Sequence, residues 1–108
     1  MSESLVRTED ENGVAWIVLN DPPTMNALSI PLLEDLEAAI NQVAAASDVS
    51  CVVLTGEGRA FSAGGDLAAF KSDIDAGRYD LFLARLEYAQ QVFNLVENLT
   101  IPVIAAVN

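Results

Sequence analysis

Three short apolar runs rich in β-branched residues stand out along the chain, at residues 14–19, 51–54 and 101–107. Runs of this length, bounded by turn residues, are typical of strands rather than helices. Residues 5–9 alternate weakly before the first run, and the Asn12-Gly13 pair between them is a hairpin signal. We therefore expect an antiparallel hairpin, then a strand at 51–54 buried on both faces, then a further parallel strand.

Apolar residues at helical spacing fill the intervals between these runs. Ser29 is placed to cap a helix that continues to about Ala46. A short helix is expected from Asp66 or Leu67, and a long one over residues 80–99. The long helix should bury one face, which carries Phe82, Leu86, Ala89, Phe93 and Val96. A strand–helix–strand order predicts an α/β fold with a parallel sheet and a right-handed crossover.

Composition narrows the class of protein. The chain has 108 residues, is 52% hydrophobic and has no apolar run long enough to cross a membrane. It carries 16 acidic and 5 basic residues, a net charge of −11, which opposes binding to nucleic acid or to an anionic membrane. No histidine is present, so Ser-His and Cys-His nucleophile pairs are excluded. The absence of a signal-peptide pattern and the single Cys51 favour the cytoplasm.

The strongest chemical signal is the loop at residues 55–66, which contains four glycines between a predicted strand and a predicted helix. Backbone amides that converge at a helix N-terminus suit an anion or a developing oxyanion. The loop is no dinucleotide fingerprint, because Phe61 occupies the third glycine position, and no Gly-Lys-Ser/Thr follows as in a P-loop. A tight turn with Asp66 as a helix cap explains the same residues, and the residues by themselves leave both interpretations open.

A family resemblance favours the oxyanion interpretation. The segment Ala60-Phe-Ser-Ala-Gly-Gly-Asp-Leu67 resembles the oxyanion loop of the crotonase (enoyl-CoA hydratase/isomerase) family. Three more segments match the family in the same order: residues 20–28, 52–56 and 101–108. The resemblance implies a crotonase-like spiral of ββα units, of which residues 1–108 would be the N-terminal part of a single domain. It also implies a homo-oligomer, either a trimer or a hexamer.

The resemblance also implies a reaction and a set of site residues. Crotonases bind an acyl-CoA thioester and stabilise an enolate-like intermediate with two backbone N–H groups, so coenzyme A arrives with the substrate and no other cofactor or metal is expected. By position, Gly65 would supply the first N–H group. The expected contacts to substrate and coenzyme A are Met25, Ala27, Ala63, Gly64, Gly65, Asp66 and Leu67. Enoyl-CoA hydratase is the first expectation for the activity, and enoyl-CoA isomerase or another crotonase reaction is the alternative.

Some parts of the family site have no counterpart in this sequence. The second N–H donor and the acid/base carboxylates would lie beyond Asn108. Ala68 also stands where many members have a basic residue near the nucleotide, which leaves Lys71 or Arg59 as candidates for phosphate contacts. A rival from another functional class is a non-catalytic acidic interaction domain from a truncated relative. Such a domain would not bind acyl-CoA.

The remaining candidates have simpler structural interpretations. Cys51 is expected in the core, Trp16 in the sheet, and Tyr79 and Tyr88 on a helix surface. The acidic residues after the loop favour a solvated, mobile segment over a metal site, because a cation would need more oxygen ligands at defined spacing. These residues are Asp73, Asp75 and Asp80.

Overall fold

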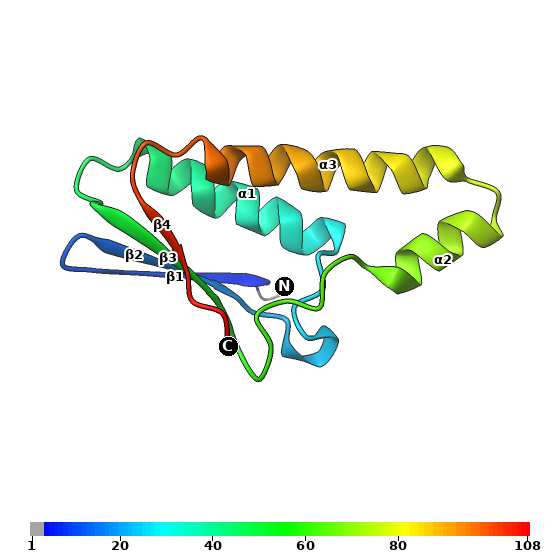
Figure 1. Cartoon of the computed structure of the whole chain (residues 1–108), viewed down its shortest axis with the longest axis horizontal. Helices are drawn as coiled ribbons and strands as arrows, with labels where there is room; N and C mark the ends of the chain where they lie inside the picture. The colour runs from blue at the N-terminus through cyan, green and yellow to red at the C-terminus, as the bar shows by residue number, and fades with distance from the viewer. Residues whose placement is uncertain (1–3) are drawn as a thin grey trace.

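A computed structural model describes residues 4–108. Four strands form one sheet in the order β1 (Val6–Glu11), β2 (Val14–Leu19), β3 (Cys51–Gly56) and β4 (Val103–Ala105). β1 is antiparallel to β2, whereas β2, β3 and β4 are mutually parallel (Figure 1). The predicted mixed sheet is therefore confirmed, although β4 is shorter than the apolar run that predicted it.

The hairpin between β1 and β2 forms at the predicted turn. Asn12 and Gly13 have φ angles of 53° and 83°, the left-handed conformation that a two-residue hairpin turn requires at both positions. The Gly13 carbonyl then accepts a hydrogen bond from Ser50 N at 2.7 Å. This contact places the start of β3 beside the turn.

Two long helices cover one face of the sheet, as Figure 1 shows. α1 (Ile30–Ala45) begins as predicted at Ser29, whose side chain accepts from Leu32 N at 3.2 Å. α3 (Tyr79–Glu97) packs against α1. The buried core lies between this layer and the sheet, and its members are Val6, Ala15, Ile17, Leu19, Leu32, Leu33, Leu36, Ala39, Ile40, Val43, Val52 and Val92.

One prediction of burial was wrong, and another was confirmed only in part. The strand at 51–54 was expected to be buried on both faces, but within β3 only Val52 is buried, because the helices cover only one face of the sheet. Trp16 of β2, which pairs with Val53 in register, is 37% exposed. The expected apolar face of α3 is also only partly covered: Val92 is its single buried residue, and Leu86 and Phe93 are 43% and 41% exposed.

Two short helices lie in the connections that leave β2 and β3, a 3-10 helix before α1 and an α-helix before α3. η1 (Pro22–Thr24) follows β2, and α2 (Leu67–Asp75) extends away from the sheet at one end of the molecule (Figure 1). Within residues 4–108, no helix combines the length and apolar character needed to cross a membrane.

Candidate functional site

The loop between β3 and α2 lies against the segment that follows η1. Leu28 N donates to Gly64 O at 2.7 Å, and Ala63 N donates to Met25 O at 2.8 Å. Leu28 and Gly65 form a parallel β-bridge. The structure thus brings together the two stretches that the sequence predicted to contact coenzyme A, although they are almost forty residues apart.

Asn26 holds these two stretches together from a fully buried position. Its Nδ2 donates to three carbonyl oxygens of the loop, at 3.1 Å to Glu57, 3.0 Å to Ala60 and 3.2 Å to Phe61. Its Oδ1 accepts from Asp21 N at 2.7 Å. With both ends of its amide used, Asn26 fixes the path of the loop from both sides.

Asn26 was not recognised as a site residue from the sequence. The available signal was its place beside Met25 after a Pro-Pro turn, because both residues adopt the left-handed backbone, with φ of 58° and 55°. Asparagine tolerates that conformation better than most residues. Ser62 adds to the arrangement: its Oγ donates to Asn26 O at 2.7 Å and accepts from Gly64 N at 3.1 Å.

Gly65 lies at the end of this loop as an exposed residue. Among residues 4–108, its N–H donates no hydrogen bond. A Cβ on Gly65 would stand 2.6 Å from Cε2 of Phe70, so a side chain at this position requires the Phe70 ring to move. The Gly65 N–H is therefore an unused hydrogen-bond donor, and the Phe70 ring lies close to the Gly65 backbone.

Asp66 caps α2, as one of the two interpretations of the loop predicted. Its Oδ1 accepts from Ala69 N at 3.1 Å, which satisfies one of the free amides at the helix N-terminus. Because this carboxylate is occupied as a cap, it is a poor candidate for a general base.

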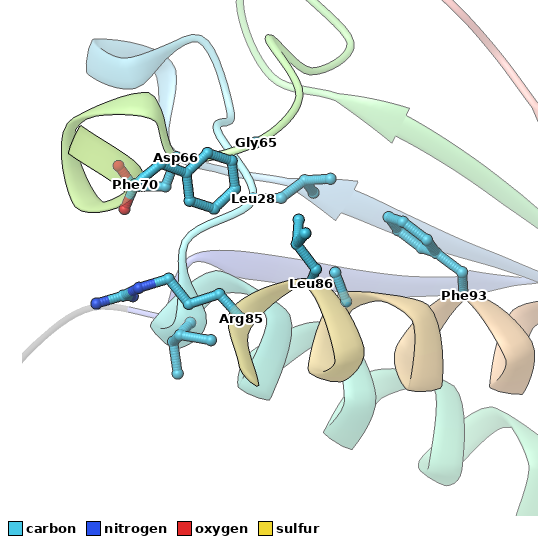
Figure 2. Close-up of a pocket in the computed structure, with 9 residues that line it drawn as sticks. Leu28, Gly65, Asp66, Phe70, Arg85, Leu86 and Phe93 are labelled. Carbon is cyan, nitrogen blue, oxygen red and sulfur yellow. The ribbon is translucent and has the colours of Figure 1, made fainter. Parts of the chain in front are cut away.

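An apolar cavity of about 240 Å³ opens beside Gly65. Leu86 and Phe93 extend from α3 toward Leu28, and Phe70 of α2 closes the end near Asp66 (Figure 2). The full lining is Leu28, Ile30, Gly65, Asp66, Phe70, Arg85, Leu86, Ala89 and Phe93. A donor amide at the edge of an apolar hollow suits a ligand with a polar carbonyl and an apolar chain.

Within the described part of the chain, Arg85 is the one basic residue that lines this cavity. Its Nε donates to Asp73 Oδ2 at 2.7 Å, and the Asp73 side chain is 6% exposed. The hydrogen bond to Asp73 raises the pKa of the Arg85 guanidinium above its usual range. The prediction that Asp73 belongs to a solvated, mobile segment was wrong, because Asp73 is buried within α2 and paired with α3.

The other charged candidates lie away from the cavity. Lys71 pairs with Asp75 one turn along α2 and is 76% exposed, and Arg59 Nη2 lies 3.9 Å from Met25 Sδ. Arg78 pairs with Asp80 at 2.8 Å, and this hydrogen bond lowers the pKa of the Asp80 carboxyl to about 2.

The remaining predicted contacts are spread around the loop. Gly64 lines a second, more open apolar hollow of about 390 Å³ together with Phe61 and Phe93. Ala63 is exposed, Leu67 is 76% exposed and Met25 is 41% exposed, and none of the three lines the first cavity. Ala27 is half-buried and donates its N–H to Thr24 Oγ1 at 3.2 Å. Within residues 4–108, no three Cys, Asp or Glu side chains converge as a metal site would require.

Comparisons with known proteins agree on one family. The family model described as Enoyl-CoA hydratase/isomerase matches residues 9–108. YngF of Bacillus subtilis (strain 168), whose name assigns it to the enoyl-CoA hydratase/isomerases, is 38% identical over 109 residues, which cover 100% of this chain and 40% of YngF. Enoyl-CoA hydratase domain-containing protein 3, mitochondrial, of Mus musculus is 33% identical over 104 residues, which cover 96% of this chain and 34% of that protein.

Solved structures give the same result. Enoyl-CoA hydratase from Bacillus anthracis aligns with a TM-score of 0.85 at 33% identity, over 96% of this chain and 40% of that one. Pseudomonas aeruginosa PA4980 aligns with a TM-score of 0.87 at 37% identity, over 99% of this chain and 46% of that one. The predicted crotonase-like α/β fold is thus confirmed over a chain that spans 34–40% of these curated relatives. The chain belongs to the enoyl-CoA hydratase/isomerase family, also called the crotonase family.

Proposed function

We propose that this chain forms the thioester-binding part of an enzyme that acts on acyl-CoA through an enolate-like intermediate. The reaction we expect is the hydration of an enoyl-CoA, and double-bond isomerisation is the alternative that uses the same loop. Membership of the family supports the substrate class. The coenzyme A portion enters with the substrate, so no separate cofactor is required.

The observation that carries this proposal is the unused Gly65 amide at the edge of an apolar cavity. When a thioester forms an enolate, negative charge develops on its carbonyl oxygen. A backbone N–H that is already fixed in place stabilises this charge without further reorganisation. The apolar lining beside Gly65 would then receive the acyl chain, while Leu28 and Asn26 hold the loop in register.

The acid/base chemistry is assigned to no residue of this chain. Among residues 4–108, Asp66 is the only carboxylate that lines the cavity, and it accepts a hydrogen bond from Ala69 N as a helix cap. Hydration needs a general acid and a general base near the double bond. Hydratase and isomerase are therefore distinguished by groups other than those of the loop.

Replacement of Gly65 tests the donor role directly. Gly65→Pro removes the N–H, and the loss of one oxyanion donor should lower kcat on an enoyl-CoA substrate by about 10²–10³-fold. Gly65→Ala keeps the N–H, but its Cβ would collide with Cε2 of Phe70 at 2.6 Å. The informative control is therefore Gly65→Ala combined with Phe70→Leu, which keeps the donor and makes room for the methyl group.

The double variant should stay within about tenfold of Phe70→Leu alone if only the donor matters, since both lack the Phe70–Phe82 contact and both keep the Gly65 N–H. Equal losses in the double variant and in Gly65→Pro would show that loop shape, not the N–H, controls turnover. The rival interaction domain is tested by the same protein samples. It would bind no acyl-CoA by calorimetry and would still co-purify with a partner protein.

Oligomeric state and compartment complete the proposal. A homo-oligomer, trimer or hexamer, is proposed by family resemblance, and sedimentation of the protein at its full natural length tests it. Cytoplasmic location stays a prediction, because one of the relatives is named as mitochondrial.

A further inference from the structure

Helix α2 is held on α3 by polar and aromatic contacts rather than by an apolar face. Of its nine residues only Asp73 is buried, and Asp73 is paired with Arg85 of α3 at 2.7 Å. A second contact is the edge-to-face pair of Phe70 and Phe82, whose ring centroids are 5.1 Å apart. A helix that docks without an apolar stripe depends on such individual contacts for its position.

The position of α2 determines the surroundings of Gly65. α2 begins at Leu67, two residues after Gly65, and Asp66 between them is its N-cap. The Phe70 ring occupies the space where a Gly65 side chain would stand. A tilt of α2 away from α3 would therefore move Asp66 and Phe70, and the Gly65 amide with them.

The Asp73–Arg85 pair differs from the other ion pairs of these helices in its burial. The Asp73 and Arg85 side chains are 6% and 30% exposed, whereas Arg78 and Asp80 are 55% and 66% exposed. Exposed pairs contribute little, but the loss of one partner from a buried pair leaves an uncompensated charge. Among the described residues, the only hydrogen bond of the Arg85 guanidinium is the one from Nε to Asp73, so the guanidinium depends on Asp73 for its orientation.

We propose that Arg85 is a positioning residue for the oxyanion donor: paired with Asp73, it holds α2 against α3 and thereby sets the direction of the Gly65 N–H. The inference rests on the proposed function and extends it to a residue outside the glycine loop. Arg85 itself donates no hydrogen bond to the reacting atoms in this scheme. Its effect should therefore appear in the chemical step rather than in substrate affinity.

The test compares Arg85→Gln, Arg85→Lys and Asp73→Asn/Arg85→Gln in the protein at its full natural length. Misplacement of a catalytic group by about 1 Å can cost on the order of 10²-fold. We expect Arg85→Gln to lower kcat by about 10–100-fold, with KM for the enoyl-CoA within about twofold. Arg85→Lys should recover part of the loss in kcat. The kcat of the double variant should be higher than that of Arg85→Gln, because no buried charge is left unpaired.

Arg78→Gln is the matched control, since it makes the same substitution in an exposed pair at the start of α3. It should turn over substrate at the wild-type rate. A rise in KM at unchanged kcat in Arg85→Gln would overturn the inference, because Arg85 would then bind substrate directly. Wild-type kinetics in Arg85→Gln would overturn it as well.

Hydrogen exchange of the α2 amides, measured without substrate, separates this inference from the proposed function. In Arg85→Gln these amides should exchange about tenfold faster than in the wild type or in Arg78→Gln, because α2 opens locally more often. Unchanged exchange overturns the inference even in an active enzyme. A wild-type protein that neither binds nor turns over acyl-CoA overturns the proposed function instead.

Discussion

Replacement of Asn26 by alanine should strongly destabilise the protein, because it removes a buried amide that joins two segments of the chain. The Asn26 side chain is fully buried, and its amide makes contacts with the backbone on both sides. Nδ2 donates to the carbonyls of Glu57, Ala60 and Phe61 at 3.1, 3.0 and 3.2 Å, and Oδ1 accepts from Asp21 N at 2.7 Å. Alanine removes all four contacts at once.

The expected loss follows from the groups left without partners. Each buried polar group that loses its hydrogen bond costs about 1–3 kcal/mol. The Asp21 N–H loses its acceptor, and the three loop carbonyls lose the donor that they share. Alanine at a φ of 58° adds about 1 kcal/mol of backbone strain. We therefore expect a loss of about 4 kcal/mol, a large part of the roughly 5–15 kcal/mol of a typical domain.

Equilibrium unfolding in urea measures this loss, and two further variants at position 26 separate its causes. Asn26→Gly accepts the left-handed backbone, so it should be about 1 kcal/mol more stable than Asn26→Ala. Asn26→Asp keeps the shape and the acceptor, but at neutral pH it has no donor and places an anion against three carbonyls. It should be at least as unstable as Asn26→Ala. A wild-type stability for Asn26→Asp, or a loss below about 1 kcal/mol for Asn26→Ala, would refute the reasoning.

Two further substitutions test other parts of the fold. Gly56→Ala would place a Cβ 2.4 Å from Phe61 O and 2.6 Å from Ala60 O; the backbone must shift, so the urea midpoint should fall by the equivalent of about 1–3 kcal/mol at constant m-value. Burial and Glu37 raise the pKa of the Tyr88 hydroxyl, which donates to Glu37 Oε1 at 3.2 Å. Because the folded-state pKa is raised, the protonated Tyr88 hydroxyl stabilises the fold. This stabilisation is complete below about pH 10 and is lost as the pH rises through the folded-state pKa. Tyr88→Phe should lower the free energy of unfolding by about 1 kcal/mol at pH 7, and its Tm should fall less steeply above pH 10 than that of the wild type. Parallel falls of Tm in both proteins would exclude Tyr88 as the titrating group.

Features that depend on a few neighbouring residues were predictable from the sequence. Asn12-Gly13 makes the hairpin turn because both residues accept positive φ, and Ser29 and Asp66 cap their helices because short side chains reach the first free amides. Each of these interactions spans at most three residues. Local chemistry therefore determines them regardless of the rest of the fold.

Features that depend on the packing of distant segments were not predictable. Val53 and Phe93 are apolar residues of the kind that usually fill a core, but their burial depends on which faces of the sheet and of α3 other elements cover. The Asp73–Arg85 pair crosses the turn between α2 and α3, and its two residues are twelve apart, so helical periodicity gives no indication of it. Asn26 likewise bonds to residues 31–35 positions away. Acidic and amide side chains are usually solvated, and only the folded geometry identifies those that are not.

The two sides of the candidate site are held by different kinds of contact, and substitutions should separate them. On the side of η1, Asn26 and Leu28 fix the loop by directional hydrogen bonds, and the Asn26 side chain is fully buried. On the side of α2, the loop depends on one buried ion pair and one aromatic pair, because α2 has no buried apolar residue. Changes on the first side should therefore lower the free energy of unfolding, since they expose unsatisfied groups throughout the loop. Changes at Arg85 should alter turnover with little effect on global stability, because α2 can move locally while the sheet and the two long helices stay folded.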